Sequence, residues 1–271
     1  MLALNLIVYI GNCKMEKYNK VIKLNNFEPK EKTLNEKELR IQLAAAYRIF
    51  NYLKWDYLIY GHITVRLPGP EKHFLINPFG LRYDEVTASN LVKIDLKGNI
   101  VEPSPHPVNP AGFIIHSAIH SAREDAHCVM HTHTPAGMAA AALKHPIKNI
   151  DFDSTSLTNR IAYHDFEGVT VREEECIRLS NNLADKSVMI LRNHGLLSVG
   201  SSIAHAFIRL HALERACHVQ MLSRSLNEEL IEVSDNIAKA HANEIENADK
   251  GELAFNSMVR LMDKIDPSFR N

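Results

Sequence analysis

The chain has 271 residues, 45% of them hydrophobic and 23% charged, a composition typical of a globular protein with a sizeable core. Its 31 basic residues balance 32 acidic ones to a formal net charge of -1, which argues against partners such as nucleic acid or an anionic membrane. The 4 cysteines are scattered and form no CxxC pair, so we expect free thiols and a cytoplasmic location.

The first residues, MLALNLIVYI, are apolar but too few to span a bilayer, and they lack the basic start and the cleavage site of a signal peptide. Polar sequence begins near Met15, which favours a true start there over a short strand or a tail packed on a partner. We expect residues 1–30 to be an N-terminal extension, disordered or wrongly included, and residues 31–271 to be one domain with a helical C-terminal tail.

Hydrophobic periodicity predicts helices and strands in alternation along the rest of the chain. In chain order we expect a helix at 34–53, two short strands about a Pro-Gly-Pro turn within 58–80, a strand and turn at 91–102, a helix at 110–123, a strand at 127–133, a helix at 135–143, a buried strand ending in a loop at 187–200, a long helix at 202–226 and further helix towards residue 271. Such alternation predicts a single α/β or α+β domain.

Two of these helices carry start signals. Asn35 with Glu38 three residues later is typical of a capping box. Thr134 followed by Pro135 is typical of a capped helix with proline at its first position. The second signal places a strand-to-helix corner directly after the sequence His131-Thr132-His133.

His131 and His133 are two residues apart in a predicted strand, so both side chains point to one face at its carboxyl end. His194, 61 residues further on, follows another apolar run, and Gly195 would let the backbone bring it close. Three neutral imidazoles suit Zn²⁺ with one position left open, as in catalytic sites. The alternative is that the pair consists of core histidines bonded to the backbone, and spacing alone leaves both interpretations open.

Other histidines lie on predicted helices. His116 and His120 are four apart and could share one face, but we favour His116 facing the site and His120 on the helix flank. His205, His211 and His218 are interpreted as surface or packing residues.

At this point the motifs resemble a known family. The segment 38–223 is similar to the class II aldolase/adducin family, above all to the adducin head domain and its bacterial relatives. The stretches that carry the resemblance are YGHITVRLPGPEKHFLINPFGLRYDEVTASNLVKIDLKGNIV, NPAGFIIHSAIHSAREDAHCVMHTHTPAGMAAAAL, IAYHDFEGVTV and LRNHGLLSVG. The resemblance implies a three-layer α/β/α fold with a mostly antiparallel central sheet. It also implies that His131, His133 and His194 match the three zinc ligands of the family's aldolases.

Two loops that hold the substrate phosphate in those aldolases match Gly61-His62-Ile63-Thr64 and Asn77-Pro78-Phe79-Gly80 here. The candidate substrate-binding residues are therefore Gly61, His62, Thr64, Asn77 and Gly80. His62 and Phe79 replace small or amide residues of the family pattern, so phosphate binding is not expected.

The family's general acid/base glutamate is also absent, because Gly112 stands at its position. Asn109 and His116 lie near by and are the remaining candidates for holding a water or carrying a proton. His116 is one helical turn beyond Gly112 on the same face.

Two functions follow from these matches and departures. The first is a metal-dependent lyase, an aldolase or decarboxylase that uses Zn²⁺ or another divalent metal and acts on a small hydroxy-carbonyl or sugar-derived compound. The second is a non-catalytic, adducin-like assembly module. The family's aldolases imply a homotetramer. Actin or spectrin binding is not expected, because the neck and the Lys-rich tail of adducins have no counterpart in this sequence.

Overall fold

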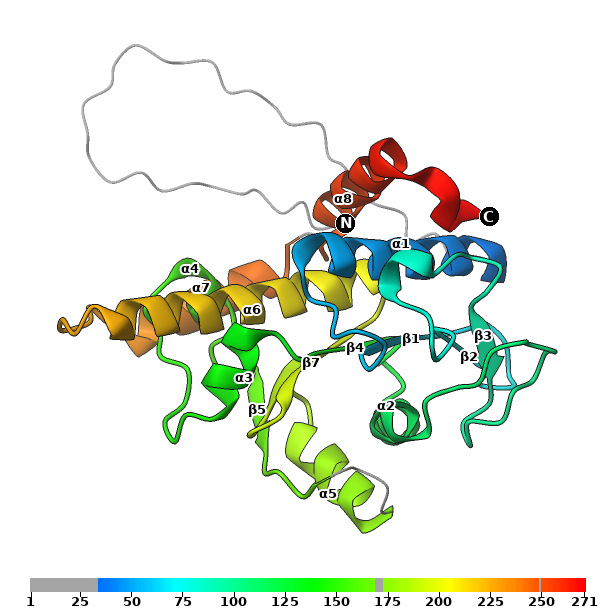
Figure 1. Ribbon diagram of the computed structural model, residues 1–271. Helices are drawn as coiled ribbons and strands as arrows, with labels where there is room; N and C mark the ends of the chain where they lie inside the picture. Colours follow the sequence, from blue (N-terminus) through cyan, green and yellow to red (C-terminus); the bar gives the residue numbers. More distant parts are fainter. Residues whose placement is uncertain (1–33, 169–172, 249) are drawn as a thin grey trace, which may run out of the picture. The chain divides into compact units, whose positions relative to one another are not determined.

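A sheet that is continuous from edge to edge organises the molecule, shown in Figure 1 as a computed structural model. The structure describes residues 34–168, 173–248 and 250–271, so the extension expected at residues 1–30 lies outside the described residues. Within these ranges the sheet has seven strands in the order β3-β2-β1-β4-β7-β6-β5. The strands are β1 His62–Arg66, β2 Phe74–Ile76, β3 Val92–Ile94, β4 Cys128–Thr132, β5 Ile161–His164, β6 Val188–Leu191 and β7 Gly195–Gly200.

Neighbouring strands pair antiparallel except β5 and β6, which run parallel. The expectation of a mostly antiparallel sheet is therefore confirmed. The helices are α1 Glu36–Leu53, α2 Pro110–Ala122, α3 Pro135–Ala141, α4 Phe152–Ser156, α5 Glu173–Leu183, α6 Ile203–Ser225, α7 Asp235–Glu246 and α8 Glu252–Ile265, with short 3-10 turns at Tyr83–Glu85 and Pro267–Arg270. None of the described helices is both long and apolar enough to cross a membrane.

Alternation along the strands assigns each helix to one face of the sheet. In β4, Cys128 and Met130 belong to a core formed with α1, α3, α6 and α8, whereas Val129 between them belongs to a core formed with α2 and α5. Figure 1 shows α1 and α6 on one side of the sheet and α2 and α5 on the other. The expected three-layer α/β/α arrangement is thereby confirmed.

Local signals in the sequence are matched closely. Asn35 and Glu38 form both hydrogen bonds of the capping box of α1. The Thr134 hydroxyl caps α3 by accepting from the Gly137 amide, and Pro135 occupies the first helical position.

The stretch 187–200, expected to be one buried strand ending in a loop, is instead a hairpin of β6 and β7. Its turn passes through Asn193, whose φ of 56° is tolerated by asparagine better than by most residues. The turn contains no Gly-Pro signal and lies between two apolar runs, so hydrophobic patterning cannot separate the two strands.

Candidate metal centre

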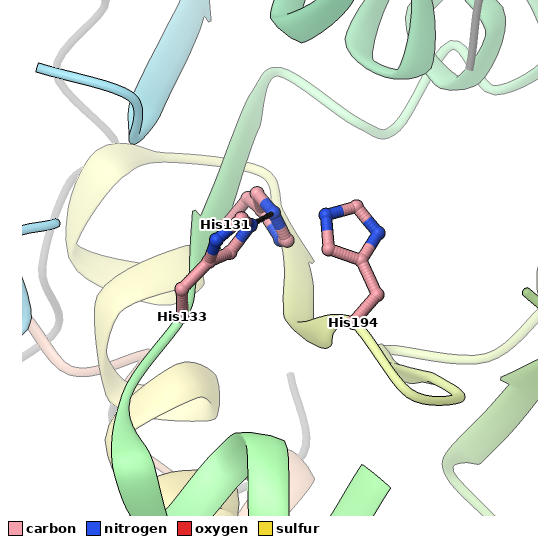
Figure 2. A group of neighbouring side chains, drawn as sticks. All are labelled: His131, His133 and His194. Atoms are coloured by element: carbon pink, nitrogen blue, oxygen red, sulfur yellow. Dashed lines mark hydrogen bonds between the residues drawn. The ribbon is translucent and has the colours of Figure 1, made fainter. Parts of the chain in front are cut away.

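Three imidazoles meet where β4 ends and the β6–β7 hairpin turns. His131 and His133 come from β4 and the residue after it, and His194 comes from the turn. The ring centroids of the three pairs are 4.5, 4.8 and 4.7 Å apart, which makes the triangle nearly equilateral. Figure 2 shows the rings pointing toward one another. We call these three residues the histidine centre.

A backbone hydrogen bond orients the innermost ring. Nδ1–H of His131 donates to the carbonyl oxygen of Leu196 at 2.8 Å, because a carbonyl can only accept. In the neutral ring the lone pair is then on Nε2, which lies 2.6 Å from Nε2 of His133. A backbone acceptor behind the imidazole is the usual way in which proteins fix a metal-ligating tautomer.

Gly195 is required for the approach of the hairpin to β4. A Cβ at this position would collide with the carbonyl oxygen of Thr132 and lie 3.2 Å from the rings of both His131 and His133. Only glycine therefore lets the backbone after His194 pass so close to the strand end. This agrees with the role expected for Gly195.

The donor set fits zinc. The candidate ligand nitrogens all lie within 4.8 Å of one another, and tetrahedral zinc with bonds of about 2.0–2.1 Å needs separations of about 3.4 Å. Burial lowers the pKa of His131 well below its usual range, and burial together with His133 lowers the pKa of His194 to about 4. Burial also lowers the pKa of His133. The imidazoles are therefore neutral near pH 7, the state that can bind a metal.

A buried carboxylate stands behind the strand end, on the opposite face of the sheet. Glu214 of α6 accepts hydrogen bonds from the hydroxyls of Thr132 at 2.5 Å and Thr134 at 2.6 Å. It is only 5% exposed, and burial raises the pKa of its carboxyl. Because Thr132 lies between His131 and His133, this contact ties the backbone that carries both imidazoles to α6.

Register brings a fourth imidazole beside the centre. In the antiparallel pair of β1 and β4, His62 is directly opposite His131, and their rings are 5.4 Å apart. On its other side the His62 ring is 4.3 Å from the ring of His116. His62 is thus the candidate substrate-binding residue that lies in contact with the histidine centre.

Thr64, His116 and His120 form a buried hydrogen-bonded group between β1 and α2. The Thr64 hydroxyl lies 2.7 Å from Nδ1 of His116 and 2.7 Å from Nε2 of His120, and all three side chains are fully buried. The two histidines therefore share one helix face, and the placement of His120 on the helix flank is wrong. Their common partner is a hydroxyl, not a metal.

The remaining candidates lie in loops: Asn77 and Gly80 follow β2, and Asn109 precedes α2. Asn77 accepts a hydrogen bond from Tyr47 at 3.0 Å and donates to the Gly61 carbonyl oxygen at 3.4 Å, so its amide holds β2 against β1. Gly80 has a φ of 103°, and nothing lies within 4 Å of where its Cβ would be. Asn109 precedes α2 as its N-cap residue, without a side-chain cap hydrogen bond.

Exposed apolar side chains border the histidine centre. The ring of Tyr57 is 5.3 Å from His133 and 5.9 Å from Tyr60, and the ring of Phe166 is 6.3 Å from His194. All three are about half exposed. Sequence reasoning missed Tyr57 and Glu214, because neither is part of a motif and both reach the site only through the tertiary fold.

Comparison with known proteins agrees with the fold. Residues 41–221 match the family model "Class II Aldolase and Adducin N-terminal domain". The chain is 43% identical to an aldolase II superfamily protein from Pseudomonas syringae. The two structures match with a TM-score of 0.84, and the match covers 89% of this chain and 98% of the other. The L-fuculose 1-phosphate aldolase of Glaciozyma antarctica PI12 is 30% identical, with a TM-score of 0.79 and coverage of 87% and 93%.

A relative of a different kind is alpha-adducin of Rattus norvegicus. It is 51% identical over 189 residues, which are 69% of this chain but only 26% of the adducin. The resemblance read from the motifs is confirmed: the chain belongs to the class II aldolase/adducin family.

Proposed function

We propose that the protein is a zinc-dependent lyase, an aldolase or a decarboxylase, that acts on a small hydroxy-carbonyl or sugar-derived compound. The observation that carries the proposal is the convergence of three neutral imidazoles, one of them held in the ligating tautomer by the Leu196 carbonyl. The similarity to an L-fuculose 1-phosphate aldolase supports the same class of chemistry.

His131, His133 and His194 would hold the ion, and zinc bound there would supply a Lewis acid that polarises a carbonyl. The protein itself would orient the imidazoles and exclude water from the site. Leu196 fixes one imidazole, and Glu214 holds the strand end through Thr132. Tyr57 and Phe166 stand beside His133 and His194 and are about half exposed.

The substrate in this proposal carries no phosphate. A phosphate site needs several free donors, such as backbone amides or cationic side chains. In the loops that match the family's phosphate site, the Asn77 amide is engaged with Gly61, and the Thr64 hydroxyl is engaged with two histidines. We therefore expect fuculose and rhamnulose phosphates to be cleaved very slowly.

Because Gly112 has no side chain that could carry a proton, another residue must do so, and we propose His116 or Asn109 for that role. Burial, with smaller contributions from neighbouring histidines, lowers the pKa of His116 well below its usual range, so the ring is a neutral acceptor near pH 7. The side chain nearest to it on the site side is His62. Replacing His116 by asparagine should lower turnover and leave the metal content unchanged. Unchanged turnover would remove His116 from the mechanism.

The second candidate, a non-catalytic assembly module, is favoured by the 51% identity to alpha-adducin and by the glycine at position 112. Metal content and a substrate screen together separate the two functions. Protein purified without chelators should contain about one zinc per chain and should turn over at least one compound in a screen of hydroxy acids, keto acids and unphosphorylated sugars. Protein that holds no metal and turns over none of them would favour the module.

We further propose a homotetramer in the cytoplasm. The exposed Tyr57, Tyr60 and Phe166 around the histidine centre are the kind of apolar rim that a neighbouring subunit covers. The buried free thiols of Cys128 and Cys217 fit a reducing compartment. Sedimentation that gives a monomer at micromolar concentration would contradict the tetramer. Actin or spectrin binding is not part of this proposal.

A further inference from the structure

His62 is a polar side chain buried beside the histidine centre. It is 4% exposed, and neither ring nitrogen has a partner of ordinary geometry, although the backbones of Tyr60 and Gly112 lie near it. A buried polar group left unpaired is costly, and such groups in native proteins usually meet a ligand or a water. Among the described residues, His62 has both nitrogens in this state while its ring touches the histidine centre.

Gly112 faces this ring from α2. A Cβ at position 112 would lie 2.8 Å from Nδ1, 2.9 Å from Cε1 and 3.1 Å from Cγ of His62. The two separations below 3.0 Å are shorter than real Cβ contacts, and the His62 ring cannot easily move away because it is enclosed by His116 and His131. An imidazole at position 62 and a side chain at position 112 therefore exclude one another.

The hydrogen bonds behind His62 determine what the buried interior offers it. Nδ1–H of His120 must donate to the Ala126 carbonyl oxygen at 2.7 Å, so Nε2 of this neutral ring accepts from the Thr64 hydroxyl. The Thr64 oxygen then accepts from Nδ1–H of His116, and Nε2 of His116 is left with a lone pair and no partner. His62 consequently lies between the ring of His116, which makes no hydrogen bond to it among the described residues, and the histidine centre on its other side.

We propose that His62 and Gly112 form a matched pair that determines specificity: the imidazole fills the space that a side chain at 112 would need, and it offers a ring nitrogen to a hydroxyl of the ligand bound at the histidine centre. This inference has two parts. The packing half is the steric exclusion between positions 62 and 112, and the ligand half is the hydrogen bond from His62 to the ligand. The ligand half rests on the proposed function. A neutral imidazole both donates and accepts, so it suits a hydroxyl group next to the chelated carbonyl.

The packing half is tested by thermal denaturation of metal-free protein. Gly112→Ala should lower the midpoint by about 3–6 °C, because overpacking outweighs the gain in helix propensity. In the His62→Ala background the same change should raise the midpoint by about 2–4 °C, because the space is then free and alanine favours the helix. An equal effect of Gly112→Ala in both backgrounds would overturn the pair.

The ligand half is tested by calorimetry on zinc-loaded protein with two probes. Acetohydroxamate and glycolohydroxamate share one chelating group, and only the second carries an additional hydroxyl. The wild type should bind glycolohydroxamate about 5- to 10-fold more tightly, the value of one hydrogen bond. His62→Phe keeps the ring shape and should abolish this preference, whereas His62→Asn should retain most of it.

The outcomes separate the two proposals. A wild type without preference, or a His62→Phe variant that keeps it, would overturn the ligand half while zinc binding stands. A wild type that holds no zinc would overturn the proposed function and the ligand half together. The denaturation cycle would still decide the packing half in that case, because it uses metal-free protein.

Discussion

The molecule contains two groups of histidines in contact, and they differ in how their nitrogens are satisfied. In the histidine centre, two imidazole nitrogens bond directly to one another, and in the described residues the one backbone acceptor bonded to these rings is the Leu196 carbonyl. Between β1 and α2, His116 and His120 meet through the Thr64 hydroxyl, and the Ala126 carbonyl closes the outer end.

This difference shows why histidine clustering alone does not define a metal site. The pair on α2 has the i, i+4 spacing of many zinc-binding helices, yet a threonine supplies the hydrogen that links the two rings. In the part of the chain that the structure describes, no hydroxyl lies among the bonds of the histidine centre, and Nε2–H of His133 donates directly to Nε2 of His131. A cation that replaced this hydrogen could bind nitrogens of all three rings, so substitutions in the histidine centre should change the metal content, whereas substitutions in the other group should change stability alone.

The largest effect is expected in the histidine centre. The double substitution His131→Ala and His194→Ala should reduce bound zinc from about one per chain to nearly none, because one remaining imidazole cannot hold the ion. Elemental analysis of protein purified without chelators measures this. The control is His120→Ala, which removes a histidine of the other group and should leave the zinc content unchanged. Full occupancy in the double variant would contradict the assignment of the ligands.

The next effect concerns the carboxylate behind the centre. Glu214→Ala should lower the free energy of unfolding by about 2–4 kcal/mol, because it opens a cavity in α6 packing and leaves the buried hydroxyls of Thr132 and Thr134 without their acceptor. Urea denaturation of metal-free protein measures the loss. Glu214→Gln keeps the shape and one acceptor oxygen, and it should cost less than half as much. Equal losses would show that the second carboxylate oxygen, and not packing, determines the stability that this position contributes.

Breaking the second group should cost less and should not touch the metal. Thr64→Val removes the hydroxyl between His116 and His120 at constant shape, and leaving both nitrogens unpaired should lower the free energy of unfolding by about 1–3 kcal/mol. Thr64→Ser, which restores the hydroxyl, is the matched control and should recover most of the stability. A loss of zinc in Thr64→Val would mean that the two groups are not independent.

The sequence predicted those parts of the site that depend on local spacing. His131 and His133 could be placed on one face because strand side chains alternate, and the corner after them could be located because Thr134 and Pro135 are local signals. His194 could be singled out because it follows an apolar run, and the resemblance in which LRNHGLLSVG matches as a block supported it, even though the hairpin within this stretch was not recognised.

What escaped prediction depends on pairing between distant segments. His62 lies opposite His131 because β1 and β4 pair in one register, and a shift of one residue would turn it to the other face. Glu214 reaches Thr132 because α6 packs on that face of the sheet, 82 residues away in the chain. Hydrophobic patterning locates such elements but does not determine which of their polar residues meet.

The smallest expected effect is a pH dependence of stability that Glu214 contributes. Burial raises the pKa of this carboxyl above its usual value near 4.5, so the folded protein keeps the proton to higher pH than the unfolded chain does. Between pH 4.5 and the raised pKa, the unfolded state binds fewer protons, and the stability of the wild type should fall relative to Glu214→Gln as the pH rises. Below pH 4.5 and above the raised pKa the difference should be constant. Its size is about 1.4 kcal/mol for each unit by which the pKa is raised. Urea denaturation of both proteins from pH 4 to pH 8 measures the difference, and a stability gap that widened in favour of the wild type with rising pH would show that the two threonine hydroxyls outweigh burial.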